Sequence, residues 1–288
     1  MVDDTETRVK EHELKRQKRE QSDVEGEEEQ WVDEATRLSA RLIYEVIRRD
    51  GVDEMTRPKT SLVFSGLAAG ILISFSVIAE AIFYVHLPDA PWRGLVESFG
   101  YSLGFLLVIK GRMQLFTENT ITTVLPLMSH PCREYFYLTG RLWFIVLAAN
   151  VVGAFIAGAF MHLTPAFSPE LKDAFQTISE RAVTHPPLVG FFKALPAGVL
   201  IAAVVWMLPT STGAPYFIIV TFTWLIAVGE FTHIIAGSVE MAYLVVSGDL
   251  GLMGSLNFFV PVFLGNVVGG TVVFTLITWA QVAAEVTQ

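Results

Sequence analysis

The chain has 288 residues, of which 52% are hydrophobic and 17% are charged, and its formal net charge is −9. The charges are unevenly distributed: residues 1–59 contain 12 Lys and Arg and 17 Asp and Glu, whereas residues 60–288 contain only 20 charged residues in 229 positions. The second part is too apolar for a water-soluble domain, which predicts a membrane protein in contact with lipid. The acidic balance of the first part argues against nucleic acid as a partner.

Cysteine content and catalytic motifs exclude further classes. Cys132 is the single cysteine of the sequence, so neither a disulfide within the chain nor a multi-cysteine zinc site can form. Ser238, close to His233, is the only hint of an intramembrane enzyme, and neither a nucleophile motif nor an H-E-x-x-H zinc pattern accompanies it. We therefore expect no catalytic residues, no metal and no cofactor.

Residues 1–59 form a charged tail with two parts. Residues 1–30 mix both signs of charge with few large apolar side chains, which predicts disorder. Residues 31–50 place Ala35, Leu38, Leu42 and Val46 at helical spacing, which predicts an amphipathic helix with these residues on its apolar edge. This helix either links solvated segments or packs on the mouth of the membrane domain or on the lipid surface.

Six apolar stretches follow, and two of them are too long for one membrane-spanning helix. At 1.5 Å per residue, 94–130 would extend about 55 Å and 215–247 about 50 Å, beyond a hydrocarbon core of roughly 30 Å. Both carry polar residues at their centres, which predicts broken helices that line a pathway. The six predicted spans are 60–86, 94–130, 138–162, 187–208, 215–247 and 257–284.

Lys and Arg near the span ends set the expected orientation. They concentrate on the side of the charged tail, which predicts that both termini are cytoplasmic and that 163–186 is an external loop. The basic residues on the tail side are Arg41, Arg48, Arg49, Arg57, Lys59, Arg133 and Arg141.

The two halves of the membrane region, 60–162 and 187–284, share short matches in the same order. Three spans in each half imply that the second copy enters the membrane from the opposite side. We therefore expect an all-α membrane protein of six transmembrane helices, an inverted 3+3 repeat with broken second and fifth helices. The matches are 67–73 with 195–201, Phe116-Thr117 with Phe231-Thr232, and Asn150-Val151-Val152-Gly153 with Asn266-Val267-Val268-Gly269.

At these positions the sequence resembles the formate/nitrite transporter family and, within it, the YfdC-like inner-membrane branch. The resemblance rests on three motifs: Gly111 with Leu115-Phe116-Thr117-Glu118-Asn119, Phe231-Thr232-His233, and Gly265-Asn266-Val267-Val268-Gly269-Gly270. It implies an aquaporin-like protomer in the inner membrane, a homopentamer with one pore in each subunit, and passage of small monovalent anions such as formate or nitrite.

The resemblance also implies roles for individual residues. Leu115, Phe116 and Thr117 match the loop that narrows the family's pore, His233 matches its central histidine, and Phe231 matches a nearby aromatic residue. An imidazole can exchange a proton near neutral pH and so suits a proton relay. The candidate pore residues are His233, Thr117, Leu115, Phe116, Phe231, Glu118, Asn119 and Thr232.

Several positions depart from the family pattern. Glu118 replaces a small residue, Thr232 replaces the acid before the histidine, Gly198 replaces a polar residue of the fourth span, and Ile226 replaces a pore-narrowing aromatic residue. These departures leave the cargo open between a small monovalent anion and, in the same fold, a cation or a small neutral solute. A receptor or scaffold role of the charged tail is a further alternative.

Charged residues within the proposed spans form a candidate charge network. Charges at such depth are usually paired or line a pathway. Either the acids pair with the bases or are protonated and hold the breaks in shape, or they line a route for something other than an anion. The residues are Glu80, Lys110, Arg112, Glu118, Lys193, Glu230 and Glu240. Asn150 and Asn266, with Gly153, Gly269 and Gly270, are expected to hold neighbouring helices together.

Overall fold

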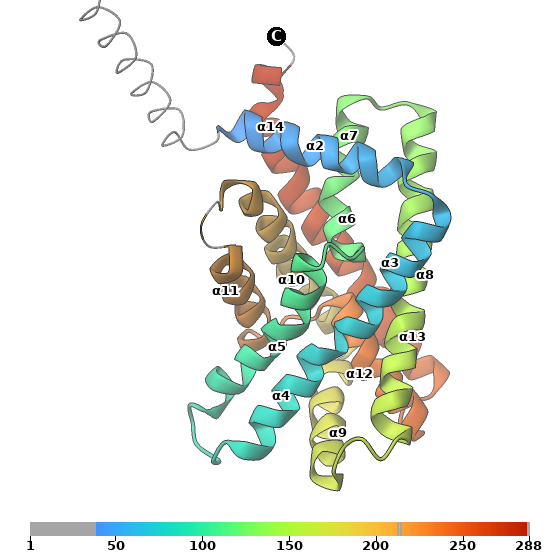
Figure 1. Cartoon of the computed structure of the whole chain (residues 1–288), viewed down its shortest axis with the longest axis vertical. Coiled ribbons are helices and arrows are strands. Elements are labelled where there is room, and N and C mark those ends of the chain that lie inside the picture. Colours follow the sequence, from blue (N-terminus) through green and yellow to red (C-terminus); the bar gives the residue numbers. More distant parts are fainter. Residues whose placement is uncertain (1–38, 212, 214, 287–288) are drawn as a thin grey trace, which may run out of the picture. The chain divides into compact units, whose positions relative to one another are not determined.

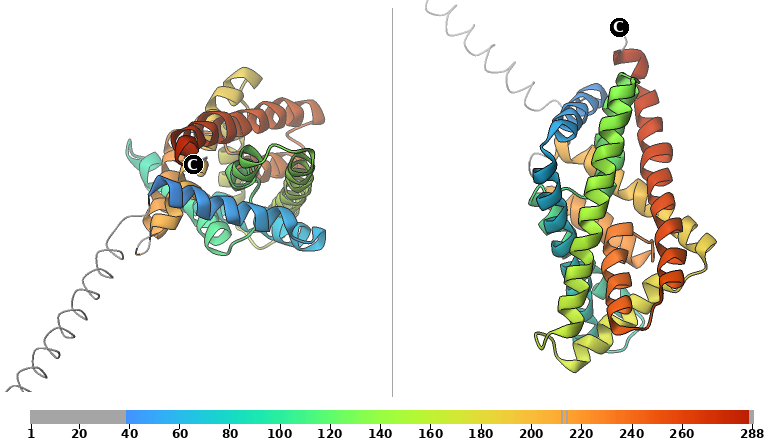
Figure 2. Two further views of the ribbon diagram at one scale, coloured as in Figure 1. Left: turned by 90° about the horizontal axis from the view of Figure 1, so that it is seen from above. Right: turned by 90° about the vertical axis from the view of Figure 1, so that its right-hand side faces the viewer.

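The computed structural model describes residues 39–211, 213 and 215–286, and within these ranges all regular secondary structure is helical. The disorder predicted for 1–30 lies outside the described residues. Figure 1 shows the arrangement of the helices, and Figure 2 shows it from two further directions.

Helix α2 (Ala40–Thr56) precedes the first apolar span. It continues beyond the predicted end at residue 50, and residues 31–38 of the predicted helix lie outside the described ranges. In the described part, Leu42 and Val46 of the predicted apolar edge are exposed. Ile43, Tyr44 and Ile47 lie on a different face, which is turned inward. They pack with residues of α6 (Phe116–Thr122), α7 (Val124–Ser129) and the C-terminal helix α14 (Leu276–Val286).

Four helical segments are long and apolar enough to cross a membrane: Lys59–His86, Arg133–Leu163, Pro187–Thr210 and Leu252–Ala283. The first contains α3 (Lys59–Leu72) and α4 (Ser74–His86), and the second is α8 (Arg133–Leu163). The third contains α10 (Pro187–Met207) and η1 (Leu208–Thr210). The fourth contains α13 (Leu252–Val267), the π-helix η2 (Val268–Thr275) and most of α14 (Leu276–Val286). Helices α8 and α13 begin five residues before the predicted spans, because hydropathy delimits only their apolar parts.

The two overlong stretches are each interrupted at the polar residues. In the first, α5 (Arg93–Lys110) is followed by α6 (Phe116–Thr122) and α7 (Val124–Ser129), and in the second, α11 (Pro215–Val228) is followed by α12 (Ile234–Ser247). We call residues 111–115 the first break and residues 229–233 the second break.

The segment 163–186, predicted as a loop, contains helix α9 (Pro169–Val183). Ser168 caps its first turn by accepting a hydrogen bond from the Leu171 amide, and Pro169 occupies the first helical position, where no amide hydrogen is needed. Helix α9 packs on α4 and α12 through Phe175 and Ile178. Figures 1 and 2 place it at the end of the helical unit opposite to α2.

Candidate functional site

The two breaks have the same backbone geometry. Arg112 (φ 52°) and Glu230 (φ 51°), 118 positions apart, adopt the left-handed conformation that is uncommon for residues other than glycine. The Met113 amide donates to the Val108 carbonyl as the Phe231 amide does to Ile226, again 118 positions apart. The pairing of Phe116-Thr117 with Phe231-Thr232, 115 positions apart, is therefore wrong by three residues: Leu115 corresponds to His233 and Phe116 to Ile234.

Asn150 of α8 and Asn266 of α13 hold the two breaks in the same way. Asn150 accepts from the Phe116 amide (2.9 Å) and donates to the carbonyls of Gly66 (2.7 Å) and Gln114 (2.9 Å). Asn266 accepts from Ile234 (2.7 Å) and donates to the equivalent carbonyls, those of Ala194 (2.8 Å) and Thr232 (3.0 Å). Non-helical backbone at membrane depth needs such internal partners.

Close helix packing brings these asparagines into place. A Cβ atom on Gly70 or Gly153 would collide with the backbone of the facing helix in the α3–α8 pair, and one on Gly198 or Gly269 would do so in the α10–α13 pair. Gly198, which lacks a Cβ atom, thus allows α10 and α13 to pack closely.

His233 of the second break and Thr117 of α6 meet in the interior. Both side chains are about 1% exposed, and His233 Nε2 lies 2.7 Å from Thr117 Oγ1. His233 Nδ1 accepts a hydrogen bond from the Ala236 amide (3.3 Å), so in the neutral ring the proton lies on Nε2 and is donated to Thr117. Among the described residues no acceptor is found for the Thr117 hydroxyl hydrogen, which is left to donate to a further group.

Two cavities approach this pair from opposite ends of α5. The first-break cavity, of about 790 Å³, reaches Ile109 and Lys110, and the second-break cavity, of about 570 Å³, reaches Gly94 to Tyr101 and extends to His233. Phe105 and Val108 lie between these positions on α5, are buried and line neither cavity. An apolar constriction therefore separates the cavities.

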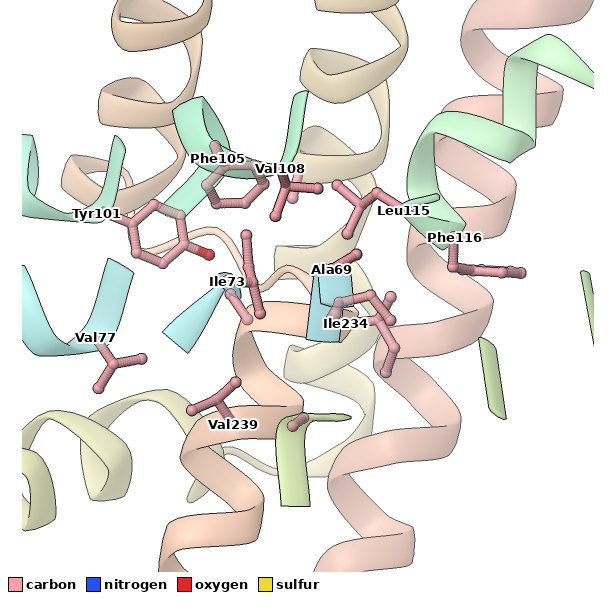
Figure 3. Packing of buried hydrophobic residues seen from close by; sticks show 14 of the residues in the cluster. Ala69, Ile73, Val77, Tyr101, Phe105, Val108, Leu115, Phe116, Ile234 and Val239 are labelled. Atoms are coloured by element: carbon pink, nitrogen blue, oxygen red, sulfur yellow. The ribbon is translucent and has the colours of Figure 1, made fainter. Parts of the chain in front are cut away.

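The constriction also contains Leu115, which is fully buried and gathers beside Phe105 and Val108 (Figure 3). The Phe105 ring contacts His233 edge-on, with the centroids 4.9 Å apart. Phe116 points away from this group in Figure 3 and packs on Trp143 and Phe263. Phe116 lines neither cavity, because its position after the break turns it toward α8 and α13, and its pore-lining role stays a prediction.

The first-break cavity is lined by acids of two elements. Glu118 lines it, and its buried Oε1 has no hydrogen-bond partner among the described residues. Glu54 of α2 accepts hydrogen bonds from Gln114 (3.1 Å), Asn119 (3.2 Å) and Thr122 (2.6 Å). Asn119 lies behind the wall of this cavity and ties the break to α2.

The remaining charged candidates line the two cavities, except Lys193, which lies beside the second-break cavity through its ion pair with Glu230. Lys110 and Arg112 are exposed and line the first-break cavity. Lys193 forms an ion pair with Glu230 (2.9 Å), and its carbonyl accepts from the Thr232 amide (3.1 Å). Phe231, Thr232 and Glu240 line the second-break cavity.

Sequence reasoning missed Glu54, Gln114, Tyr101 and Phe105. Tyr101 and Phe105 could have been found from the sequence, because they are aromatic residues one helical turn apart on the predicted broken helix. Glu54 carried none, because its partners are about 60 positions away along the chain.

Comparison with known proteins shows which family the chain belongs to. The model of the formate/nitrite transporter family matches residues 41–280. Inner membrane protein YfdC of Escherichia coli (strain K12) is 42% identical over 244 residues, which cover 84% of this chain and 79% of that protein. A solved FNT family ion channel superposes with a TM-score of 0.72 at 20% identity, covering 83% of this chain and 98% of the other. A pentameric formate channel with formate bound gives a TM-score of 0.66 at 21% identity, covering 79% and 98%.

The family match spans most of the described helices and includes both breaks. The chain is a multi-pass membrane protein that belongs to the formate/nitrite transporter family.

Proposed function

We propose that this chain conducts small monovalent anions of the formate and nitrite type along a path that joins the two cavities past Thr117 and His233. The observation that carries the proposal is the Thr117–His233 hydrogen bond, which leaves the Thr117 hydroxyl hydrogen free to donate to a passing oxyanion. The start of α12 at Ile234 adds the partial positive charge of a helix N-terminus.

The surroundings favour a selective passage. Leu115, Phe105 and Val108 provide an apolar constriction that hinders hydrated ions, and the hydroxyl and imidazole offer compensating polar contacts at one point. The names of relatives agree with this cargo, since the Haemophilus influenzae protein, 24% identical over 245 residues, is called a formate channel.

The proposal includes an architecture. Residues 60–162 and 187–284 form an inverted 3+3 repeat of six spans, and the matching asparagine contacts and left-handed residues support it. The protein lies in the inner membrane with both termini in the cytoplasm. Helix α9 is then on the external side, and the charged tail of residues 1–59 is on the cytoplasmic side. Five copies assemble, each with its own pore, and exposed aromatic side chains such as Phe64 and Phe144 face lipid or a neighbouring copy.

A second candidate cargo is a cation or a small neutral solute. The observation in its favour is that Asp50, Asp53, Glu54 and Glu118 all line the first-break cavity. Arg57, Lys110 and Arg112 line the same cavity, so the acids face cations within it and an anion can still enter.

Flux measurements in proteoliposomes separate these candidates. Under a formate or nitrite gradient we expect uptake of that anion, and under a sodium or ammonium gradient we expect neither uptake nor a potential above empty liposomes. A potential that follows sodium or ammonium, or osmotic swelling with a neutral solute in the absence of formate flux, would refute the anion cargo.

A further inference from the structure

The second-break cavity contains more acids than its bases neutralise. Glu97 forms ion pairs with Arg93 (3.4 Å) and Arg181 (3.6 Å). Glu230 pairs with Lys193, which also lies 3.3 Å from His185 Nε2. Arg93, Arg181 and Lys193, the bases in or beside the cavity, are thus already paired with Glu97 or Glu230.

Two acids of the same cavity are left over. Glu240 of α12 is 5% exposed and lines the cavity, and no hydrogen bond or ion pair of its carboxyl is found within the described ranges. Glu80 of α4 lines the cavity too and has no such partner among those residues. Arg181 attracts Glu80 through the cavity without forming an ion pair with it.

Of the elements packed on α12, α9 brings one base into the cavity, Arg181, which is paired with Glu97. Among the described residues, the other elements bring none. His162 of α8 contacts Tyr243, with the rings 5.4 Å apart, and does not line the cavity. The carbonyl of Lys172 in α9 accepts from the Tyr243 hydroxyl (2.9 Å), and α13 carries no charged residue. Glu118 of α6 lines the opposite cavity. Glu240 therefore faces Glu80, the ion pairs described above and His233.

Helix geometry aligns Glu240 with His233. The two residues are seven positions apart, two turns and about 10 Å along α12, so they lie on one face. Tyr101 lies on the facing helix α5, is 6% exposed and lines the cavity, and its hydroxyl has no partner among the described residues. Its ring contacts Phe105 (5.2 Å), which contacts His233. Glu240 is thus placed before the constriction, and His233 within it.

We propose that Glu240, with Glu80 beside it, is a proton-binding site that protonates a weak-acid anion in the second-break cavity before the cargo passes His233. The inference rests on the anion cargo proposed above. A buried carboxylate without a counter-charge repels an approaching anion strongly. The anion can therefore approach when the carboxyl group carries a proton and is neutral. The same proton lowers the cost of moving the cargo through the apolar constriction, because a neutral acid needs no compensating charge there.

The transfer step is balanced in atoms and charge. The O–H bond of the Glu240 carboxylic acid breaks and a new O–H bond forms on an oxygen of the anion, which leaves the Glu240 carboxylate and a neutral cargo acid. A proton from the solution that fills this cavity then restores the Glu240 acid. The cargo releases its proton beyond the constriction, so one proton accompanies each anion and nothing is oxidised or reduced.

The test compares wild type, Glu240→Gln and Glu80→Gln with the matched control Glu180→Gln, an exposed acid of α9 that lines neither cavity. Formate uptake and internal pH are recorded together in proteoliposomes between about pH 5 and pH 8. Wild type and Glu180→Gln should move one proton with each formate, with uptake rising by up to about tenfold per pH unit as the pH falls through the titration. Uptake by Glu240→Gln should no longer depend on pH in this way. In Glu80→Gln the rise in uptake should remain but occur at a different pH.

Several outcomes would overturn the inference. Glu240→Gln that keeps the wild-type pH profile and proton count excludes Glu240 as the proton site. An ammonium current in wild type that is abolished in Glu240→Gln would show that these acids serve a cation pathway, and it would refute the proton site. Should Glu240→Gln fail to fold, infrared spectroscopy of wild type replaces it: a carboxylic acid band that titrates with pH and is altered in Glu80→Gln supports the site, and its absence refutes it. Wild type without formate flux at any pH refutes the anion cargo itself.

Discussion

Asn150 and Asn266 make equivalent sets of three hydrogen bonds, each joining one helix break to one packed helix pair. Each asparagine accepts from the first amide of a half-helix and donates to one carbonyl of the break and one carbonyl of the packed helix. The shape of both breaks therefore depends on side chains that line neither cavity.

Asn150→Ala and Asn266→Ala should each destabilise the protein by about 2–4 kcal/mol, because three buried hydrogen bonds are lost, two of them to backbone groups of the break and the half-helix start. Thermal unfolding in detergent measures the loss. Asn257→Ala, which removes an exposed amide from α13, serves as the control and should unfold like wild type. Equal stability of all three variants would contradict the bracing role.

Thr117→Val should lower formate flux about two- to tenfold, since a hydrogen bond contributes about 0.5–1.5 kcal/mol. Valine has the shape of threonine but offers no hydroxyl hydrogen to the cargo and accepts nothing from His233. Thr117→Ser keeps the hydroxyl and is the control, with flux close to wild type in the same liposome assay. Similar flux of Val and Ser variants would remove Thr117 from the path.

Leu115→Ala should widen the apolar constriction and raise the ratio of acetate to formate flux by about tenfold, the discrimination that one added methyl group meets in a hydrophobic site. Leu142→Ala removes a fully buried leucine of α8 that lines neither cavity, so it makes a matched control. Both variants should lose about 2–5 kcal/mol of stability through the space that they leave. An unchanged flux ratio in Leu115→Ala would exclude Leu115 from the constriction.

The contact of α2 with the first break should depend on pH through Glu54. Burial raises the pKa of Glu54, an effect that outweighs its hydrogen bonds from Thr122 and Gln114. Because the folded form binds the proton more tightly than the unfolded form, the contact is strongest below the unfolded pKa and weakens as the pH rises through the folded pKa. Hydrogen exchange of residues 40–56 should accordingly speed up on raising the pH, beyond the intrinsic exchange rate.

Glu54→Gln should abolish this pH dependence, since glutamine does not titrate. Glu45→Gln on the same helix is the control: the Arg48 guanidinium, helped by Arg49, lowers the pKa of Glu45 to about 2, so Glu45 stays charged throughout the measured range. Wild type and Glu45→Gln should show the same pH dependence, and its persistence in Glu54→Gln would exclude Glu54 as its source.

The sequence predicted both breaks because excess length and central polar residues are local features. The alignment of the halves was wrong by three residues because side-chain identity at Phe116 and Phe231 reflects different surroundings, whereas the shared feature is backbone geometry at Gly111-Arg112 and Gly229-Glu230. Pairing these two dipeptides, which lie 118 positions apart, gives the alignment of the breaks that the backbone geometry shows.

The contacts of α2 were beyond sequence reasoning for a different reason. Hydropathy favoured the edge with Leu42 and Val46, while packing selected Ile43, Tyr44 and Ile47. The choice between neighbouring faces of a weakly amphipathic helix is made by distant partners, which no local pattern contains.

The two asparagine braces also have an evolutionary consequence. Since the backbone of each break is held from behind, by helices away from the cavities, residues that face the cavities can be exchanged without loss of the backbone form. A change such as Glu118 or Thr232 then alters the chemistry met by the cargo and leaves the frame intact. In this chain the groups that the cargo meets are therefore separate from the groups that hold the backbone frame.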